Sequence, residues 1–236
     1  LMGTYAEECA DTFGFTRQAQ DAFAVTSLQR AQEANREGHF AWEIAPVTLR
    51  SGKGDRFVDQ DESPFKANFE KIPQLKPAFR KDGTVTAANS SSISDGAAAM
   101  VLMRRSEAAA RGLSPVATIL GHTTHAQEPG LFTTAPAAAI RKLFDRIGWT
   151  AADVDLFEIN EAFAVVTMAA MRDHGLPHDK VNVSGGACAL GHPIGASGAR
   201  IMVTLVGALR RRGLKRGVAS LCIGGGEATA IAIELA

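Results

Sequence analysis

The sequence predicts an α/β protein in which helices cover both faces of a sheet. Apolar strand-like runs alternate with helix-like segments from residue 116 onward, and this alternation is typical of layered α/β folds. The runs are mostly apolar throughout, as expected of strands that are buried on both faces. The length of 236 residues allows one large domain or two small ones.

The N-terminal residues predict two helices. Thr4 and Glu7 have the spacing of a capping box, so a short helix should start at Thr4. Thr16 is the expected N-cap of a long helix that ends before Gly38. One stripe of side chains should follow this helix: Ala19, Ala22, Phe23, Thr26 and Arg30, with Leu28 and Ala31 beside it.

The following residues predict a hairpin, an irregular stretch, a strand and a helix. Residues 44–49 and 56–58 should pair, because a cluster of turn-forming residues separates them. Residues 59–82 are rich in proline, lysine and charge and should be mostly irregular. Residues 96–103 predict a buried strand, and residues 106–111 predict a helix.

The rest of the chain predicts strands and helices in alternation. The expected order is a strand from Val116, a helix at 136–147, a strand at 154–159, a helix at 161–174, a strand at 181–184, a helix at 193–212, and strands at 217–223 and 228–235. The turn between the last two strands is so short that they must be antiparallel.

Composition excludes several function classes. The formal net charge is zero, which argues against nucleic acid as the main partner. No apolar run reaches the roughly 18 residues that a membrane span needs, and no signal peptide is visible. The three cysteines lack CxxC or zinc spacing, so no metal site is expected and the cytoplasm is the expected compartment. No nucleotide-binding fingerprint is present.

Residues 185–198 contain the most informative motif, with His192 just before a predicted helix. Pro193 suits the first helical turn, and Gly195 and Gly198 would let another backbone or a ligand approach closely. The positive end of the helix should keep the imidazole neutral, so that it can polarise a carbonyl or accept a thiol proton. The alternative is a structural histidine at a helix end.

Two further polar groups follow predicted strands. Asn160 comes directly after the run 154–159, and Cys222 lies at the end of the run 217–223. Strand ends form the site crevice of α/β folds, so the amide, the imidazole and the thiol should meet around one substrate. The alternatives are a helix N-cap for Asn160 and a buried apolar residue for Cys222.

The ordered motifs resemble the thiolase family. The likeness rests on NEAFA at 160–164, GHPIGASGAR at 191–200 and CIGGG at 222–226, and on MGTYAE at 2–7, QDAFA at 20–24 and DGTVTA at 82–87. The resemblance implies a thiolase-like layered α-β-α fold. Residues 1–92 would be a CoA-binding loop region inserted in the N-terminal half, residues 93–114 the end of that half, and residues 115–236 the complete C-terminal domain. The chain resembles the C-terminal part of a subunit, without the segment that carries the nucleophilic cysteine.

The resemblance also implies catalytic roles. His192 would take the proton of the nucleophilic cysteine and donate to the thioester oxygen, and Cys222 would exchange a proton with the substrate carbon or the leaving CoA thiol. Asn160 would hold a water molecule that completes an oxyanion hole together with His192. Gly224 would supply a backbone N–H to a second oxyanion hole; the alternative is a plain hairpin turn.

A CoA site is implied as well. Ser91 would contact the pantetheine arm, Phe132 and Phe163 would line the acyl pocket, and Met2 would lie at the same site. The alternatives are a loop cap for Ser91 and simple core packing for the phenylalanines. CoA enters as a substrate, so the resemblance implies no cofactor.

The implied function is acyl transfer between CoA thioesters in fatty-acid metabolism, by thiolysis or the reverse Claisen condensation through an acyl-cysteine. The family includes acetyl-CoA acetyltransferases and 3-ketoacyl-CoA thiolases. Expected partners are acyl-CoA, CoA, the rest of the subunit, and further copies in a homodimer or homotetramer. Two alternatives stay open: a thioester hydrolase that uses Cys188 or Cys222 with His192, and a non-catalytic CoA-binding module.

Overall fold

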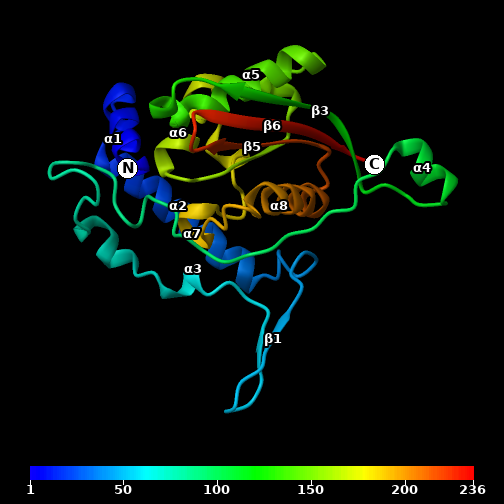
Figure 1. The fold of residues 1–236 in the computed structure, drawn as a ribbon, viewed down its shortest axis with the longest axis horizontal. Helices are drawn as coiled ribbons and strands as arrows, with labels where there is room; N and C mark the ends of the chain where they lie inside the picture. The colour runs from blue at the N-terminus through cyan, green and yellow to red at the C-terminus, as the bar shows by residue number, and fades with distance from the viewer.

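The computed structural model describes all residues from 1 to 236 and places a four-stranded sheet between layers of helices (Figure 1). The α-helices are α1 (Met2–Phe13), α2 (Arg17–Arg36), α3 (Ser63–Lys66), α4 (Arg105–Ala110), α5 (Ala135–Ile147), α6 (Ala164–His174), α7 (Ala187–Leu190) and α8 (Ser197–Arg212). The 3-10 helices are η1 (Phe69–Gln74), η2 (Pro129–Thr134), η3 (Ala151–Asp153) and η4 (His178–Lys180). The strands are β1 (Val47–Leu49), β2 (Arg56–Val58), β3 (Ala117–Ala126), β4 (Leu156–Ile159), β5 (Arg216–Ile223) and β6 (Glu227–Leu235).

The main sheet has the order β3-β6-β5-β4. Strand β4 runs parallel to β5, whereas β6 is antiparallel to both β5 and β3. The antiparallel pairing of the last two strands is therefore confirmed. Because β4 and β5 are parallel neighbours, their carboxyl ends reach the same edge of the sheet, where Asn160 and Cys222 lie.

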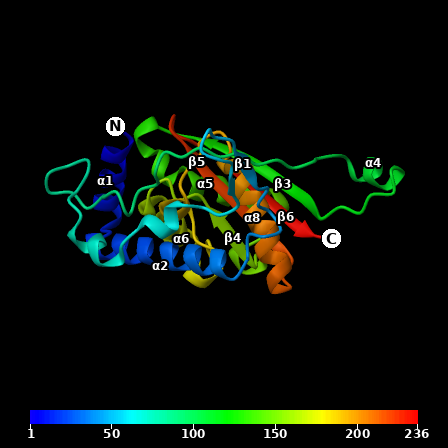
Figure 2. The same ribbon diagram turned by 90° about the horizontal axis from the view of Figure 1, so that it is seen from below.

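Helices cover both faces of this sheet, as the sequence predicts (Figure 2). Helix α5 packs on β3, β5 and β6, and α8 packs on β4, β5 and β6. Neighbouring residues of β5 separate the two faces: Val218 belongs to the core beneath α5, and Ala219 belongs to the core beneath α8. Since side chains alternate along a strand, an apolar run can feed both cores at once.

The N-terminal helices differ from expectation in two respects. Thr16 caps α2 as predicted, because its side chain accepts a hydrogen bond from the Ala19 N–H. The capping box at Thr4 is wrong: α1 already begins at Met2, and Glu7 instead accepts from the N–H groups of Thr84 and Val85. The predicted stripe on α2 is also partly wrong, since Ala19 and Ala22 are exposed. The buried face consists of Gln20, Asp21, Phe23, Ala24, Ser27, Leu28, Ala31 and Ala34.

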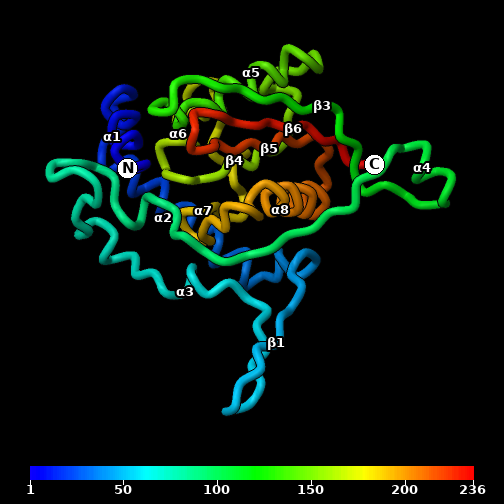
Figure 3. Tube along the Cα trace, viewed as in Figure 1, coloured from blue at the N-terminus to red at the C-terminus, as the bar shows by residue number.

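Two predicted strands are absent. Residues 96–103 form no strand, and Val101 and Leu102 are 86% and 68% exposed. This segment runs as an extended chain past α8 to α4 (Figure 3). None of the six strands pairs with it. Residues 181–184 contribute only one bridge, between Val181 and Phe157. The hairpin β1–β2, the helix at α4 and the other alternating elements are confirmed.

Candidate active site

His192 lies on the loop that leads into α8. Its backbone N–H donates to the Ser92 carbonyl at 3.0 Å, which ties the loop to the extended segment after Ser90. The prediction that Pro193 lies in the first helical turn is wrong. Pro193 precedes the helix and begins a separate turn, in which its carbonyl accepts from the N–H groups of Ala196 and Ser197. The helix therefore starts at Ser197 and brings that side chain against the imidazole.

A chain of hydrogen bonds assigns the tautomer of His192. The Ser197 hydroxyl donates to the Pro193 carbonyl at 3.1 Å, and Ser197 Oγ lies 2.5 Å from Nδ1 of the imidazole. The Asn160 amide nitrogen can only donate and faces Nε2, so all three contacts are satisfied when Nε2 accepts and Nδ1–H donates to Ser197 Oγ. Nε2 is then unprotonated. It faces the amide nitrogen of Asn160 at 3.4 Å.

The charge state of His192 follows from its surroundings. Burial lowers the pKa of the imidazole, and the positive charge of Arg200 lowers it further. Both effects disfavour the protonated ring, so His192 is neutral near pH 7. The neutral form agrees with the prediction, although desolvation and a neighbouring guanidinium cause it instead of the helix end.

Asn160 is buried and extends from the end of β4. Its backbone N–H donates to the Ser220 carbonyl, which continues the pairing of β4 with β5. Helix α6 begins only at Ala164, with Phe163 in the N-cap position, so Asn160 does not cap it. The side-chain amide nitrogen faces His192, and the buried side-chain oxygen has no hydrogen-bond partner. An unsatisfied buried acceptor of this kind is suited to a bound water molecule or substrate.

Cys222 lies two residues beyond Ser220 on β5 and is buried in an aromatic environment. It shares a hydrophobic cluster with Phe132 and Phe163, whose rings lie edge to face at 6.3 Å. Burial raises the pKa of the Cys222 thiol to about 12, so the thiol keeps its proton at neutral pH. No hydrogen bond joins the thiol to His192 or Asn160. The two phenylalanines are core residues that also border the region of Cys222.

Gly224 and Met2 lie together although they are at opposite ends of the chain. A Cβ atom added to Gly224 would lie 3.4 Å from the terminal methyl carbon of Met2. Gly224 belongs to the turn between β5 and β6, and Met2 opens α1. The N-terminal helix thus closes one side of the turn that follows Cys222.

Ser91 lies next to the loop after Asn160. Its backbone N–H and its hydroxyl both approach the Ala162 carbonyl at 3.0 Å. The neighbouring Ser90 forms a bridge with Phe163. In this structure the hydroxyl of Ser91 thus holds two site loops together, and it is only half-buried.

The glycines that permit close approach are not those predicted. A Cβ added at Gly195 or Gly198 would meet no atom within 4 Å. A Cβ on Gly186 would instead lie 2.2 Å from the carboxyl carbon of Glu161, and one on Gly191 would lie 2.1 Å from Ser94 Oγ. The tight packing is therefore on the loop before His192, where the side chains of Glu161 and Ser94 approach the backbone.

Glu161 is a structural residue of the site that sequence reasoning missed. The buried carboxylate accepts from Ser27 Oγ at 2.7 Å, Asn182 Nδ2 at 2.8 Å and the Cys188 N–H at 3.1 Å. It thereby joins α2, the loop at 182–186 and α7 directly behind Asn160. Burial raises its pKa, while these hydrogen bonds oppose the rise. The available signal was a charged residue next to Asn160, directly after a predicted buried strand.

The three cysteines are free, and none has a nucleophile's environment. Burial raises the pKa of Cys9, of Cys188 and of Cys222. For Cys188, the nearby Glu161 carboxylate adds to this rise. Since the thiolate is the nucleophile, these surroundings oppose the attack that a cysteine hydrolase requires.

The described side chains include no group of three His, Cys, Asp or Glu residues that is arranged to hold a metal ion. No helix combines the length and the apolar composition that crossing a membrane requires.

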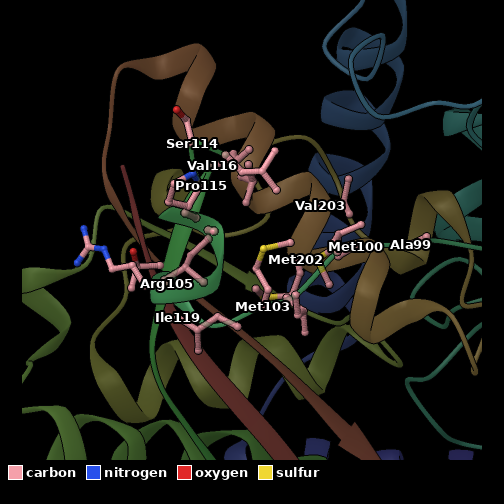
Figure 4. A pocket seen from close by; sticks show the side chains of 18 of the residues that line it. Ala99, Met100, Met103, Arg105, Ser114, Pro115, Val116, Ile119, Met202 and Val203 are labelled. Carbon is pink, nitrogen blue, oxygen red and sulfur yellow. The ribbon is translucent and has the colours of Figure 1, made fainter. Parts of the chain in front are cut away.

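A large apolar groove lies along α8 (Figure 4). It has a volume of about 730 Å³ and is lined by residues 99–103, by residues 113–119 and by α8. Met100, Met103 and Met202 contribute to its wall. Because 15 of its 20 lining residues are hydrophobic, the groove offers mainly apolar surface.

Comparison with known proteins assigns both parts of the chain to one family. Residues 1–106 match the model of the thiolase N-terminal domain, and residues 113–235 match the model of the thiolase C-terminal domain. An acetyl-CoA acetyltransferase of Allochromatium vinosum is 47% identical over 235 residues. That match covers 99% of this chain and 60% of the relative.

Solved structures agree. The acetyl-CoA acetyltransferase of Bacillus anthracis superposes with a TM-score of 0.97 at 43% identity, and human mitochondrial 3-ketoacyl-CoA thiolase with a TM-score of 0.91 at 36% identity. Each match covers the whole of this chain and 60% of the other. The chain thus spans about 60% of the length of the relatives it matches, and its sequence and fold show that it belongs to the thiolase family.

Proposed function

We propose that this chain supplies the acid–base half of a thiolase active site, which transfers acyl groups between CoA thioesters. The observation that carries the proposal is the contact between Asn160 and the unprotonated Nε2 of His192 at 3.4 Å. A neutral imidazole with a free lone pair can accept a thiol proton. An adjacent amide donor, with a bound water molecule, can stabilise a developing oxyanion.

In the proposed thiolysis, the nucleophilic cysteine comes from thiolase sequence that this chain does not span. Nε2 of His192 accepts the proton of that thiol, and the thiolate attacks the 3-keto carbonyl of the substrate. The bond between C2 and C3 breaks, and its electron pair goes to C2. The protonated thiol of Cys222 gives its proton to C2, so that the shorter acyl-CoA leaves.

The second half-reaction restores the enzyme. The thiol of incoming CoA returns a proton to Cys222, and the CoA thiolate attacks the acyl-cysteine carbonyl. The bond to the cysteine sulfur breaks, and this sulfur regains its proton from His192. The raised pKa of Cys222, about 12, supports this role, because the thiol stays protonated until a carbanion is present.

The proposed substrate contacts follow the geometry around this centre. Gly224 offers a backbone N–H in a turn next to Met2, and we assign this N–H to the oxyanion of the acyl-cysteine. Phe132 and Phe163 would border the acyl group, and Ser91 the pantetheine arm. CoA serves as a substrate in this scheme, and no cofactor takes part.

The test uses the complete thiolase subunit with acetoacetyl-CoA and CoA. His192→Ala should reduce thiolysis by about 10²-fold or more, because a positioned acid–base group contributes that much to the rate. His122→Ala removes an exposed imidazole and should retain the activity. Full thiolysis by His192→Ala would refute the assignment. Thioester hydrolysis without added CoA would instead support the hydrolase alternative.

We propose further that the apolar groove along α8 is covered by the part of a thiolase that this chain does not span. About 40% of the length of such a relative lies outside the match, since this chain covers 60% of it. Exposed apolar side chains on its wall, such as Val101 and Leu102, are typical of a surface that another segment covers. The extended segment at 96–103 also has unpaired backbone groups that a strand could pair with.

The assembly and the compartment are also proposals. We expect a homodimer or homotetramer, which light scattering of the complete subunit would measure. Three free cysteines support a reducing compartment such as the cytoplasm, and fractionation of the source cells would test this.

A further inference from the structure

The chain after η4 covers the outer edge of β4, the strand that leads to Asn160. Strand β4 lies at one end of the sheet, so only one of its edges pairs with β5. On the other edge, Val181 forms a bridge with Phe157, and the Asn182 N–H donates to the Phe157 carbonyl at 2.9 Å. Asn182 then turns the backbone away, because it is the one non-glycine residue with a positive φ, 48°. Ile159 is therefore left without a backbone partner on this edge.

The side chain of Asn182 continues the pairing where its backbone stops. Oδ1 accepts from the Ile159 N–H, and Nδ2 donates to the Ile159 carbonyl, both at 2.8 Å. A side-chain amide has a carbonyl oxygen and an NH2 group, so it can replace the peptide group of a neighbouring strand. The two partners on Ile159 also determine which end of the amide is the oxygen. Asn182 thus extends the sheet edge up to the residue before Asn160.

The remaining proton of the Asn182 amide bonds to the residue after Asn160. Nδ2 donates to Oε1 of Glu161 at 2.8 Å. The other carboxylate oxygen accepts from Ser27 Oγ and from the Cys188 N–H, so Glu161 is held from both sides. Asn182 is 1% exposed, and water does not compete for its hydrogen bonds. One buried amide therefore holds both neighbours of Asn160.

The side chain of Asn160 has no comparable support of its own. Its backbone N–H donates to the Ser220 carbonyl, and its backbone carbonyl accepts from the Ala162 N–H. The side-chain oxygen has no partner, and the amide nitrogen contacts His192 Nε2 at 3.4 Å. Because no further side chain bonds to this amide, its direction depends on the backbone around it.

We propose that Asn182 is a positioning residue for Asn160: its side-chain amide completes the edge of β4 and so orients the Asn160 amide toward the imidazole of His192. The inference rests on the proposed function only for the chemical role of Asn160. The placement of Asn160 is a separate expectation, which a structure tests without turnover.

The experiment uses the complete thiolase subunit with Asn182→Gly, which removes the amide and still permits the positive φ. A crystal structure of this variant should show the Asn160 side chain displaced, without its contact to His192 Nε2. The kcat for thiolysis of acetoacetyl-CoA should fall about 10-fold or more, with a smaller change in KM, because a small misplacement of a catalytic group affects mainly the chemical step.

A double-mutant cycle separates positioning from a general loss of stability. Asn160→Ala should lower kcat about 10²-fold. Adding Asn182→Gly should then have little further effect, because the residue that it positions no longer carries an amide. The matched control is Thr123→Ala, which removes a buried hydrogen bond to the Ala139 carbonyl between β3 and α5. It should lower stability in urea unfolding and leave kcat unchanged.

Asn182→Asp tests the same role if Asn182→Gly does not fold. The carboxylate keeps an acceptor for the Ile159 N–H but loses both donors and lies beside Glu161. Its kcat should fall near neutral pH and recover relative to wild type as the pH is lowered, because a protonated carboxyl donates again. An unchanged kcat in this variant would contradict the proposal.

The other outcomes are equally decisive. The proposal fails if Asn182→Gly leaves the position of Asn160 and kcat unchanged, if its effect adds in full to that of Asn160→Ala, or if the control lowers kcat as much. If Asn160→Ala keeps full activity while Asn182→Gly still displaces Asn160, the proposed catalytic role of Asn160 fails and the positioning role stands.

Discussion

At the scale of single residues, short hydrogen-bond chains and burial set the chemistry of the site. Asn160 and Ser197 together assign the proton of His192 to Nδ1, because the Asn160 amide nitrogen donates to Nε2 and Ser197 Oγ can accept from Nδ1–H. Cys222 has no such partner, and burial alone keeps its thiol protonated. One residue is thereby prepared to accept a proton and the other to donate one.

The cysteine surroundings predict slow alkylation. With iodoacetamide at pH 8, Cys222 should react about 10³-fold more slowly than a free cysteine, because a pKa of about 12 leaves little thiolate. Cys9 and Cys188 should also be slow, since burial raises their pKa values. Peptide mass spectrometry would measure each rate, with the protein unfolded in guanidinium as the control. Rapid labelling of native Cys188 or Cys222 would contradict the assignment and favour the hydrolase alternative.

At the scale of elements, the loop before His192 is held in place by side chains that are distant in the sequence. Glu161 bonds to α2, to the loop at 182–186 and to the start of α7. Gly186 lies directly against its carboxyl group. The position of the imidazole therefore depends on the packing of α2, the loop and α7 around one buried carboxylate.

Two glycine substitutions separate this packing from helix propensity. Gly186→Ala should lower the free energy of unfolding by about 1–3 kcal/mol, because the added methyl overlaps a carboxyl group held by three hydrogen bonds. Gly198→Ala lies in the first turn of α8 with open space around its Cβ. It should be neutral or stabilise by up to about 1 kcal/mol. Urea unfolding would measure both, and equal stabilities of the two variants would contradict the packing argument.

At the scale of the whole molecule, the chain contains a four-stranded main sheet and an apolar segment that pairs with no strand. Residues 96–103 are as apolar as a buried strand, yet they lie extended along the groove beside α8. Their exposed side chains and unpaired backbone distinguish them from β5. The residues of β5 are mostly buried, and the strand pairs with both β4 and β6.

Hydrogen exchange should report this difference. In the 236-residue chain, amides of residues 96–103 should exchange within seconds, whereas those of β5 should be strongly protected, because only β5 has strand partners. In the complete thiolase subunit the same residues should become protected. Exchange mass spectrometry would follow both segments. Equal protection in the isolated chain, or no gain in the complete subunit, would contradict the proposal that other thiolase sequence covers the groove.

The sequence alone determined the alternation of elements, the antiparallel end of the sheet and the identity of the motif residues. These features depend on local signals: apolar runs, turn glycines and the Thr16 cap all act within a few neighbours. The roles taken from the family resemblance for His192, Asn160, Cys222 and Gly224 remain proposals, although the structure places the first two in contact.

Only the tertiary structure decided the rest, because it depends on contacts between distant segments. Glu7 could form a capping box by its spacing, but bonds to Thr84 and Val85 instead. Residues 96–103 could form a strand by their composition, but pairing needs a second strand. The protonation of His192 likewise follows from Arg200 and from burial, which no local pattern specifies. A residue's type and spacing limit what it can do, and the groups brought against it in the folded chain select one outcome.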